Sequence, residues 1–257
     1  MAEGVGRLRR LKYQILSGVP GRRGAHHTKK LGATRRAEVE TAFDAALAAA
    51  GGRVCIDLGA NAGEYTTMLA DRAAKVYAFE PDPWTAALLR ENLAGCDNVE
   101  IVEAAAGAAA GRMPIYRSTK FGDDPTKASL ASTLLPEKTN VQKSASAEVD
   151  VVDFRAFAEG LDTDIWLLKI DIEGGEVELL ERLLDHPVLD RIDYILVETH
   201  ETGLPSLAAR TRALRRRAAR LARPVIEMDW HERLRRRAGL LSRDLSVHTL
   251  DPVEVQL

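Results

Sequence analysis

Two acidic positions, each at the end of an apolar run, carry the first chemical signal in this sequence. Asp57 lies near the end of one run, and Gly59 and Gly63 follow it in a turn. A second run, over residues 75–79, ends at Glu80. In parallel sheets, ligands often bind where an apolar strand is followed by a glycine turn and the start of a helix. The pattern therefore predicts a nucleotide-like cofactor at this position.

The composition of the turn narrows the choice of cofactor. In the dinucleotide-binding fingerprint, Gly-x-Gly-x-x-Gly, the backbone approaches a pyrophosphate closely. Here Asp57 stands at the first glycine position, where it would repel a pyrophosphate and suit a cationic ammonium or sulfonium group. Glu80 can accept hydrogen bonds from both hydroxyls of a ribose. A plain strand-to-helix turn with an acidic cap is the alternative, and Glu80 in register favours the cofactor.

A second group of ionisable residues follows two later apolar runs. Lys169, Asp171 and Glu173 alternate with apolar residues, so their side chains share one side of a strand. The next run ends at Glu198 and His200. Acids and a histidine at adjoining strand ends could form a general base or a divalent-metal site. The alternative is an ion pair of Lys169 with the acids and a helix cap from Glu173.

Alternating strands and helices must position these residues. Strands are expected at 53–58, 75–80, 98–104, 164–171, 192–198, 224–230 and 246–250, and helices at 64–73, 83–94, 175–185 and 205–222. Such alternation predicts an α/β sandwich with a mostly parallel sheet.

Two segments depart from this alternation. Residues 1–34 form a basic extension with one short helix and a loop, which could act as a lid, and a clear helix begins at Arg35. Residues 107–150 are rich in Gly, Pro, Ser and Thr and are expected to form a mobile substrate insert, flanked by short strands near 112–116 and 147–152. The domain is therefore assigned to residues 35–257.

Composition excludes several classes of protein. A chain of 257 residues with 46% hydrophobic residues can bury the core of one large domain. A net charge of −2 gives no overall attraction to nucleic acid or to an anionic membrane. Cys55 and Cys96 suggest a reducing compartment. No apolar run reaches about 18 residues, and no signal-peptide pattern is seen at the N-terminus, so a cytoplasmic location is expected.

The motifs together resemble those of the FkbM family of S-adenosylmethionine (SAM)-dependent methyltransferases. The resemblance rests on residues 56–63, 78–81, 169–174 and 198–200. It implies a Rossmann-like class I methyltransferase fold, with a mostly parallel seven-stranded sheet whose last strand is reversed. It also implies O-methylation of a hydroxyl, often on a sugar or a glycosylated metabolite.

The resemblance carries residue roles with it. The expected cofactor-binding residues are Asp57, Gly59, Asn61, Gly63, Glu80, Pro81, Ala104, Ala105 and Asp171, with the adenine against Ala104 or Ala105. The expected catalytic residues are Asp171, Lys169 and His200. The expected ligands of Mg²⁺ or another divalent cation are Asp171, Glu198 and His200.

Two other functions remain open on sequence alone. A nicotinamide-dependent oxidoreductase would suit the fold and Glu80. A non-catalytic module could bind a polyanion through the arginine-rich face of residues 205–223, although such a face is usually solvated. The expected partner is a small-molecule hydroxyl acceptor, to which Ser129, Ser132 and Thr133 could donate hydrogen bonds. No nucleic-acid partner is expected, and a homo-oligomer is compatible with the sequence.

Overall fold

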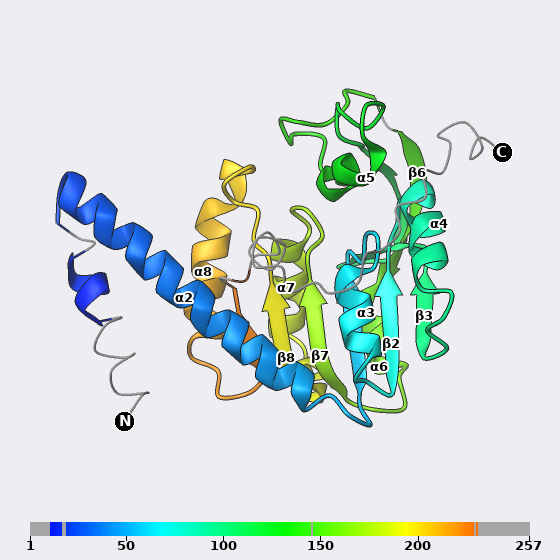
Figure 1. Cartoon of the computed structure of the whole chain (residues 1–257), viewed down its shortest axis with the longest axis horizontal. Coiled ribbons are helices and arrows are strands. Elements are labelled where there is room, and N and C mark those ends of the chain that lie inside the picture. The colour runs from blue at the N-terminus through cyan, green and yellow to red at the C-terminus, as the bar shows by residue number, and fades with distance from the viewer. Residues whose placement is uncertain (1–10, 17–18, 145, 229, 231–257) are drawn as a thin grey trace.

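A six-stranded sheet forms the centre of the molecule (Figure 1). The computed structural model describes residues 11–16, 19–144, 146–228 and 230. The strand order is β3-β2-β1-β7-β8-β9, and each adjacent pair is parallel. The strands are β1 (Val54–Leu58), β2 (Lys75–Phe79), β3 (Val99–Val102), β7 (Ile165–Ile170), β8 (Ile192–Val197) and β9 (Val225–Glu227). The order reverses between β1 and β7, which is the position where open α/β sheets bind ligands.

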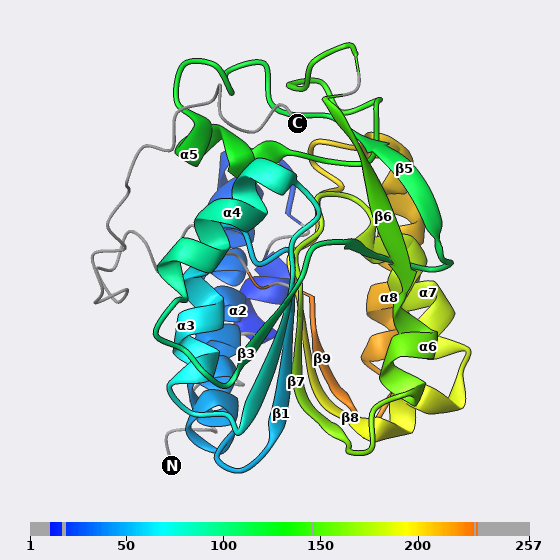
Figure 2. The same ribbon diagram turned by 90° about the vertical axis from the view of Figure 1, so that its right-hand side faces the viewer.

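Helices cover both faces of this sheet, as Figure 2 shows. One face carries α2 (Arg22–Ala48), α3 (Glu64–Ala70) and α4 (Pro83–Asn92), and the other carries α6 (Phe154–Glu159), α7 (Glu176–Leu184) and α8 (Ala208–Ala218). All five residues of β1 are buried, as expected for a strand covered on both sides. Short 3₁₀ helices, η2 (Pro187–Arg191) and η3 (Pro205–Leu207), precede β8 and α8.

A second, three-stranded sheet is built around the insert. It contains β4 (Ala105–Gly107), β5 (Gly111–Ile115) and β6 (Ala147–Asp153) in the order β4-β6-β5. Strands β5 and β6 are those expected near 112–116 and 147–152. Between them lie α5 (Pro125–Ala128) and the 3₁₀ helix η1 (Ser129–Ala131). In Figure 1 this segment lies beyond the arrowheads of the central sheet, so it covers the carboxyl ends of the strands.

The N-terminal segment differs from its expected form. Residues 11–16 are helical, but α2 begins at Arg22 and not at Arg35, so the expected domain boundary at residue 35 falls inside one helix. A glycine inside a helix costs only about 1 kcal/mol, and strong helix formers around it can offset that cost. The half of α2 from Val39 onward packs on the core, where Val39 and Phe43 are buried.

The far end of the sheet departs from the expected topology. Of the two last strands expected, the first corresponds to β9, which is parallel to β8. The second, at 246–250, lies outside the described residues, and no reversed strand occurs in the central sheet as far as it is described. Within the described ranges, no helix has both the length and the apolar character that a bilayer crossing requires.

Candidate active site

A cavity of about 240 Å³ lies at the carboxyl ends of β1, β2 and β7, beneath the insert. Most residues that were expected to bind a cofactor line it, namely Gly59, Asn61, Glu80, Pro81, Ala104, Ala105 and Asp171. Asp57 and Gly63 are not among its lining residues. The cavity therefore brings together both motifs identified in the sequence, and contact of these residues with a cofactor stays a prediction.

Asp57 lies below the cavity and has protein partners. Its side chain is fully buried, and it accepts hydrogen bonds from Lys169 Nζ at 2.8 Å and from Thr66 Oγ1 at 2.8 Å. Lys169 Nζ also donates to the carbonyl of Gly59 at 2.9 Å. In this structure the cation next to Asp57 is Lys169, and a contact of Asp57 with a cationic cofactor stays a prediction. The ion pair of Asp57 and Lys169 thus holds the turn that follows β1.

Gly59 is required where the turn meets the second motif. Its φ is +81°, and a Cβ atom at this position would lie 1.8 Å from the carbonyl oxygen of Asp171. No side chain fits in that space. The glycine thus lets the β1 turn lie directly against the end of β7.

Glu80 is a buried carboxyl group in the wall of the cavity. Its side-chain oxygens accept hydrogen bonds from the backbone N–H groups of Asn61 and Asp82, each at 3.0 Å. Burial raises the pKa of Glu80 from its usual 4.5 to about 8, and these hydrogen bonds oppose the shift. Each carboxylate oxygen can accept more than one hydrogen bond. Glu80 therefore retains the capacity to bind the hydroxyls of a ligand.

Asp171 and His200 meet at the ends of β7 and β8. Burial raises the pKa of Asp171 to about 6, while Lys169 and His200 oppose that shift. His200 Nε2 lies 3.7 Å from Asp171 Oδ1 and 3.2 Å from Glu173 Oε2, and its Nδ1 lies 3.2 Å from Glu176 Oε1. Burial by itself would lower the pKa of His200, but these carboxylates outweigh it and raise the pKa to about 9. His200 is thus charged at neutral pH, and its catalytic role stays a prediction.

The expected metal-ligand set changes by one residue. Among the described residues, the potential ligand atoms that lie within 4.8 Å of one another belong to Asp171, Glu173 and His200. Glu198 does not belong to this group; its backbone N–H donates to the carbonyl of Ile170 in the neighbouring strand. The alternation of Glu173 with Asp171 in the sequence had already indicated that these two side chains share one side of the strand.

Insert residues that were not singled out in the sequence attach to both motifs. Arg117 pairs with the buried Asp82, with Nε 2.6 Å from Oδ2. Lys138 Nζ binds the carboxylate of Glu173. These contacts could not be found from local spacing, because each joins residues far apart in a segment without helical or strand periodicity.

Of the three hydroxyl groups that were expected to bind substrate, those of Ser129 and Thr133 have partners within the protein, whereas the buried Ser132 Oγ has none among the described residues. Ser129 exchanges hydrogen bonds with the side chain of Asn61, and Thr133 Oγ1 donates to the carbonyl of Glu173 at 2.7 Å. They fasten the insert to the cavity, which they also line together with Ser132.

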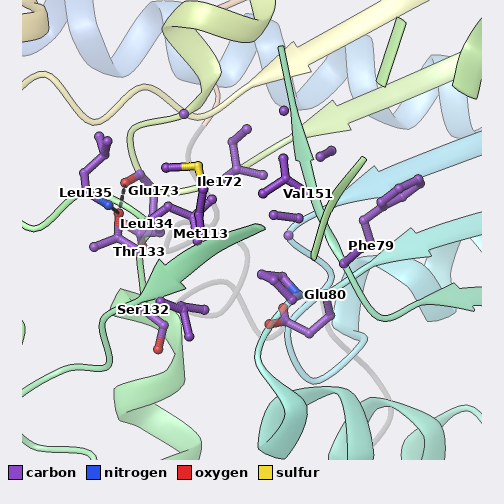
Figure 3. A pocket seen from close by; sticks show the side chains of 18 of the residues that line it. Phe79, Glu80, Met113, Ser132, Thr133, Leu134, Leu135, Val151, Ile172 and Glu173 are labelled. Carbon is purple, nitrogen blue, oxygen red and sulfur yellow. Dashed lines mark hydrogen bonds between the residues drawn. The ribbon is translucent and has the colours of Figure 1, made fainter. Parts of the chain in front are cut away.

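Apolar side chains form the remainder of the wall. They are Met113, Ile115, Leu130, Leu134, Leu135, Val151 and Ile172. Figure 3 shows Met113, Leu134 and Ile172 grouped beside Glu173, with Glu80 on the opposite side of the cavity. The cavity therefore has a polar end at Glu80. Its apolar region lies next to Asp171 and Glu173, which together with His200 form a group that we call the acidic cluster.

Comparison with known proteins gives one match at the level of a family. Residues 57–221 match the methyltransferase FkbM domain family, which covers more than half of the chain. No curated protein matches the chain.

Several solved structures share parts of the fold at low similarity. The methyltransferase FkbM from Methylobacillus flagellatus KT is 17% identical, with a TM-score of 0.40 over 63% of this chain and 37% of that chain. An rRNA methylase from Streptococcus thermophilus is 13% identical, with a TM-score of 0.37 over 66% of this chain and 77% of that chain. Phosphoethanolamine N-methyltransferase 1 from Haemonchus contortus is 15% identical, with a TM-score of 0.28 over 72% of this chain and 30% of that chain. The chain thus spans little more than a third of the first of these proteins.

Proposed function

Because the chain belongs to the FkbM methyltransferase domain family, we propose that it transfers a methyl group from SAM to a hydroxyl of a small molecule bound in the cavity. The observation that carries this proposal is Asp171. It is a nearly buried carboxyl group that lines the cavity, and its pKa of about 6 leaves it ionised and able to accept a proton at neutral pH. A hydroxyl acceptor must lose a proton, and Asp171 is placed to take it.

The residues at the other end of the cavity suit the methyl donor. Glu80 lines the cavity, and its carboxylate can accept hydrogen bonds from the two hydroxyl groups of a ribose. Ala104 and Ala105 line the same end with small apolar side chains that leave room for the flat face of an adenine ring. Gly59 and Asn61 complete the turn beneath. When bound there, SAM supplies an electrophilic methyl group on a positively charged sulfur.

Three residues around the reacting position have separate roles. Asp171 receives the proton of the acceptor hydroxyl. Lys169 Nζ lies 3.9 Å from Asp171 Oδ2, and His200 Nε2 lies 3.7 Å from Asp171 Oδ1. These two cations favour the ionised form of Asp171 against the effect of burial. Lys169 and His200 are therefore positioning residues.

A sugar or a glycosylated metabolite is the proposed acceptor. Ser132 supplies a hydroxyl group that has no hydrogen-bond partner among the described residues, and Met113, Leu134 and Ile172 supply apolar surface near the acidic cluster. A glycoside with an apolar aglycone presents both kinds of surface. Polar and apolar lining residues in one cavity are also typical of small-molecule sites.

A divalent cation does not fit the acidic cluster as it is arranged. The carboxylate of Glu173 already binds Lys138 Nζ. His200, with its pKa raised to about 9, holds a proton that a metal ligand must release. We therefore propose no metal-dependent step.

The other two functions considered from the sequence have less support. Membership in a methyltransferase family argues against a nicotinamide oxidoreductase. Four of the seven arginines in residues 205–223, which were expected to bind a polyanion, take part in ion pairs within the protein. These pairs are Arg210 with Glu181, Arg215 with Glu201, Arg217 with Asp185 and Arg223 with Asp193. Such pairs partly neutralise the positive face of α8.

Two measurements test the proposal. Calorimetry should detect binding of SAM and no binding of NAD. Mass spectrometry of a panel of sugars, glycosides and other hydroxyl compounds, incubated with the protein and SAM, should show one product with a single added methyl group. Binding of NAD in place of SAM would contradict the proposed donor, and methylation of amines alone would contradict the proposed acceptor.

A further inference from the structure

Lys138 is a nearly buried cation that the insert delivers to the acidic cluster. Only 8% of its surface is exposed. Its Nζ atom donates to the carbonyl of Ala131 at 3.0 Å and to the carboxylate of Glu173. Burial of a charged ammonium is costly unless it is paired and hydrogen-bonded. The carbonyl of Ala131 and the carboxylate of Glu173 meet this requirement for Lys138, so the buried ion pair is a stable element of the site.

The cluster that receives Lys138 has the spacing of a metal site. His200 Nε2 lies 3.2 Å from Glu173 Oε2 and 3.7 Å from Asp171 Oδ1. Three ligand atoms at such separations can surround one cation at about 2.0 to 2.6 Å. The oxygen through which Glu173 would bind a metal ion is the same Oε2 atom that Lys138 contacts. A metal ion would have to displace the ammonium.

The backbone around Glu173 holds this arrangement in place. Glu173 has a φ of +54°, a conformation that non-glycine residues rarely adopt, and Thr133 Oγ1 donates to its carbonyl at 2.7 Å. A Cβ atom on the following Gly174 would lie 2.5 Å from Leu135 Cδ1. The turn and the insert are therefore packed together on both sides of Glu173, which limits movement of Lys138 away from it.

We propose that the ammonium group of Lys138 takes the place of a metal ion in this cluster, so that the methyl transfer needs no divalent cation. Lys138 neutralises Glu173, which leaves Asp171 as the acid of the cluster that receives the substrate proton. Lys138 is thus a positioning residue for the proposed reaction. Its effect on turnover rests on the proposed function, whereas its effect on metal binding does not.

The direct test is titration with Mn²⁺ in the absence of SAM and acceptor. The wild-type protein should show no stoichiometric binding, and its methyl transfer should be unchanged by a chelator. The Lys138→Met variant removes the charge and keeps an unbranched side chain, so the freed Glu173 should bind Mn²⁺ at least about tenfold more tightly than the wild type. A second change, Glu173→Gln, should remove the gained binding.

Control variants separate this role from general loss of structure. Lys127→Met removes another lysine of the insert, whose exposed pair with Asp124 leaves it far more solvated than Lys138, and should change neither Mn²⁺ binding nor turnover. Lys138→Arg keeps the charge and should restore resistance to Mn²⁺. Lys138→Met should lower kcat and leave the affinity for SAM within about twofold, because Glu80 lies at the other end of the cavity.

Two results would overturn the proposal. One is stoichiometric Mn²⁺ binding by the wild-type protein with activity lost on chelation, which needs no variant and decides the matter even if Lys138→Met does not fold. The other is a folded Lys138→Met protein that binds Mn²⁺ no more tightly than the wild type. If no acceptor is methylated by any form of the protein, the proposed function fails while the Mn²⁺ titrations still decide the role of Lys138.

Discussion

Three carboxyl groups at the ends of β1, β2 and β7 differ in their surroundings and therefore in their roles. Asp57 is fully buried, and its carboxylate accepts a hydrogen bond from Lys169 Nζ. Glu80 is buried, its carboxylate accepts hydrogen bonds from the backbone N–H groups of Asn61 and Asp82, and its pKa rises to about 8. Asp171 lies near two cations, and its pKa is only raised to about 6. At neutral pH these surroundings favour a proton on Glu80 and none on Asp171.

The first prediction is that SAM binding releases a proton, and it follows from the raised pKa of Glu80. Without a ligand, Glu80 is mostly protonated at pH 7, because its pKa of about 8 lies above that pH. Ribose hydroxyls that donate hydrogen bonds favour the carboxylate, so binding should lower this pKa and release up to about one proton. The affinity for SAM should therefore increase as the pH rises from 6 to 8.

Calorimetry at pH 7 in two buffers of different ionisation enthalpy measures the released protons. The Glu80→Gln variant should show weaker binding with no proton release. Equal release by the variant and the wild type would assign the proton to another group.

At the scale of elements, two polar links hold the site together. The insert is joined to the N-terminus of α4 by Arg117, whose side chain binds Asp82 through two nitrogens. The end of β8 is joined to the start of α7 by His200, whose backbone N–H and Nδ1 both lie near Glu176 Oε1. The first link fixes the insert to a helix that covers the central sheet, and the second fixes the end of a central strand to a helix.

Removal of Arg117 should loosen the insert. Arg117→Met leaves the buried carboxylate of Asp82 without its cation, which typically costs about 3 to 5 kcal/mol of unfolding free energy. The affinity for SAM should also fall, by about tenfold, because Asp82 donates its backbone N–H to Glu80.

The matched control is Arg112→Met in the neighbouring strand, where an exposed pair with Asp150 contributes little. Chemical denaturation and calorimetry of both variants give the comparison. Equal stability losses in the two variants would show that the link to Asp82 has no special role.

His200 gives stability a pH dependence of known sign. Its pKa in the folded protein, about 9, lies above its ordinary value of 6.5. The charged ring therefore stabilises the fold fully below pH 6.5, and this contribution is lost as the pH rises through about 9. The shift corresponds to roughly 3 kcal/mol.

The His200→Gln variant should thus be less stable than the wild type at pH 6 by an amount of that order. The difference should shrink steadily toward pH 9. Urea denaturation at pH 6, 7.5 and 9 measures it, and a difference that grows with pH would contradict the assigned charge.

At the scale of the whole molecule, the site occupies the reversal of strand order between β1 and β7. The insert lies over this edge, and helices on both faces keep the strands buried (Figures 1 and 2). The N-terminal half of α2 extends away from the body of the molecule, beyond α8 and far from α5 (Figure 1). A lid role for residues 1–34 stays a prediction, and the position of α2 gives it no support.

Removal of residues 1–34 should therefore leave the site intact. The part of α2 that packs on the core begins at Val39. We expect a change in thermal midpoint within a few degrees, roughly that of a loss below 1 kcal/mol, with unchanged SAM affinity and kcat. A large fall in kcat with unchanged stability would support the lid.

The sequence allowed prediction of the parts of this molecule that depend on local patterns. Apolar runs that end in acids and glycines located β1, β2, β7 and β8, and seven of the nine residues expected to bind a cofactor line the cavity. Long-range choices between similar side chains could not be predicted. Lys169 was expected to pair with neighbouring acids, and it lies 3.9 Å from Asp171, but its closer partner at 2.8 Å is Asp57, which is 112 residues away along the chain. Likewise, the sequence did not show that Glu173 would lie beside His200, with its Oε2 3.2 Å from His200 Nε2.

The extent of α2 and the anchoring of the insert were also missed. Glycines near the start of α2 suggested a loop, although the helix continues through them. The contacts of Arg117 and Lys138 depend on how a segment without periodicity folds back over the sheet. Such contacts arise from tertiary packing and leave no spacing signal.

The turnover of the Asp171→Asn variant tests the central claim most directly. Asparagine has nearly the shape of aspartate but cannot accept the substrate proton at neutral pH. With SAM and an identified acceptor, kcat should fall by about 100-fold or more, while calorimetry shows the affinity for SAM within a few-fold of wild type. Turnover within a few-fold of wild type would contradict the assignment of Asp171 as the base of this site.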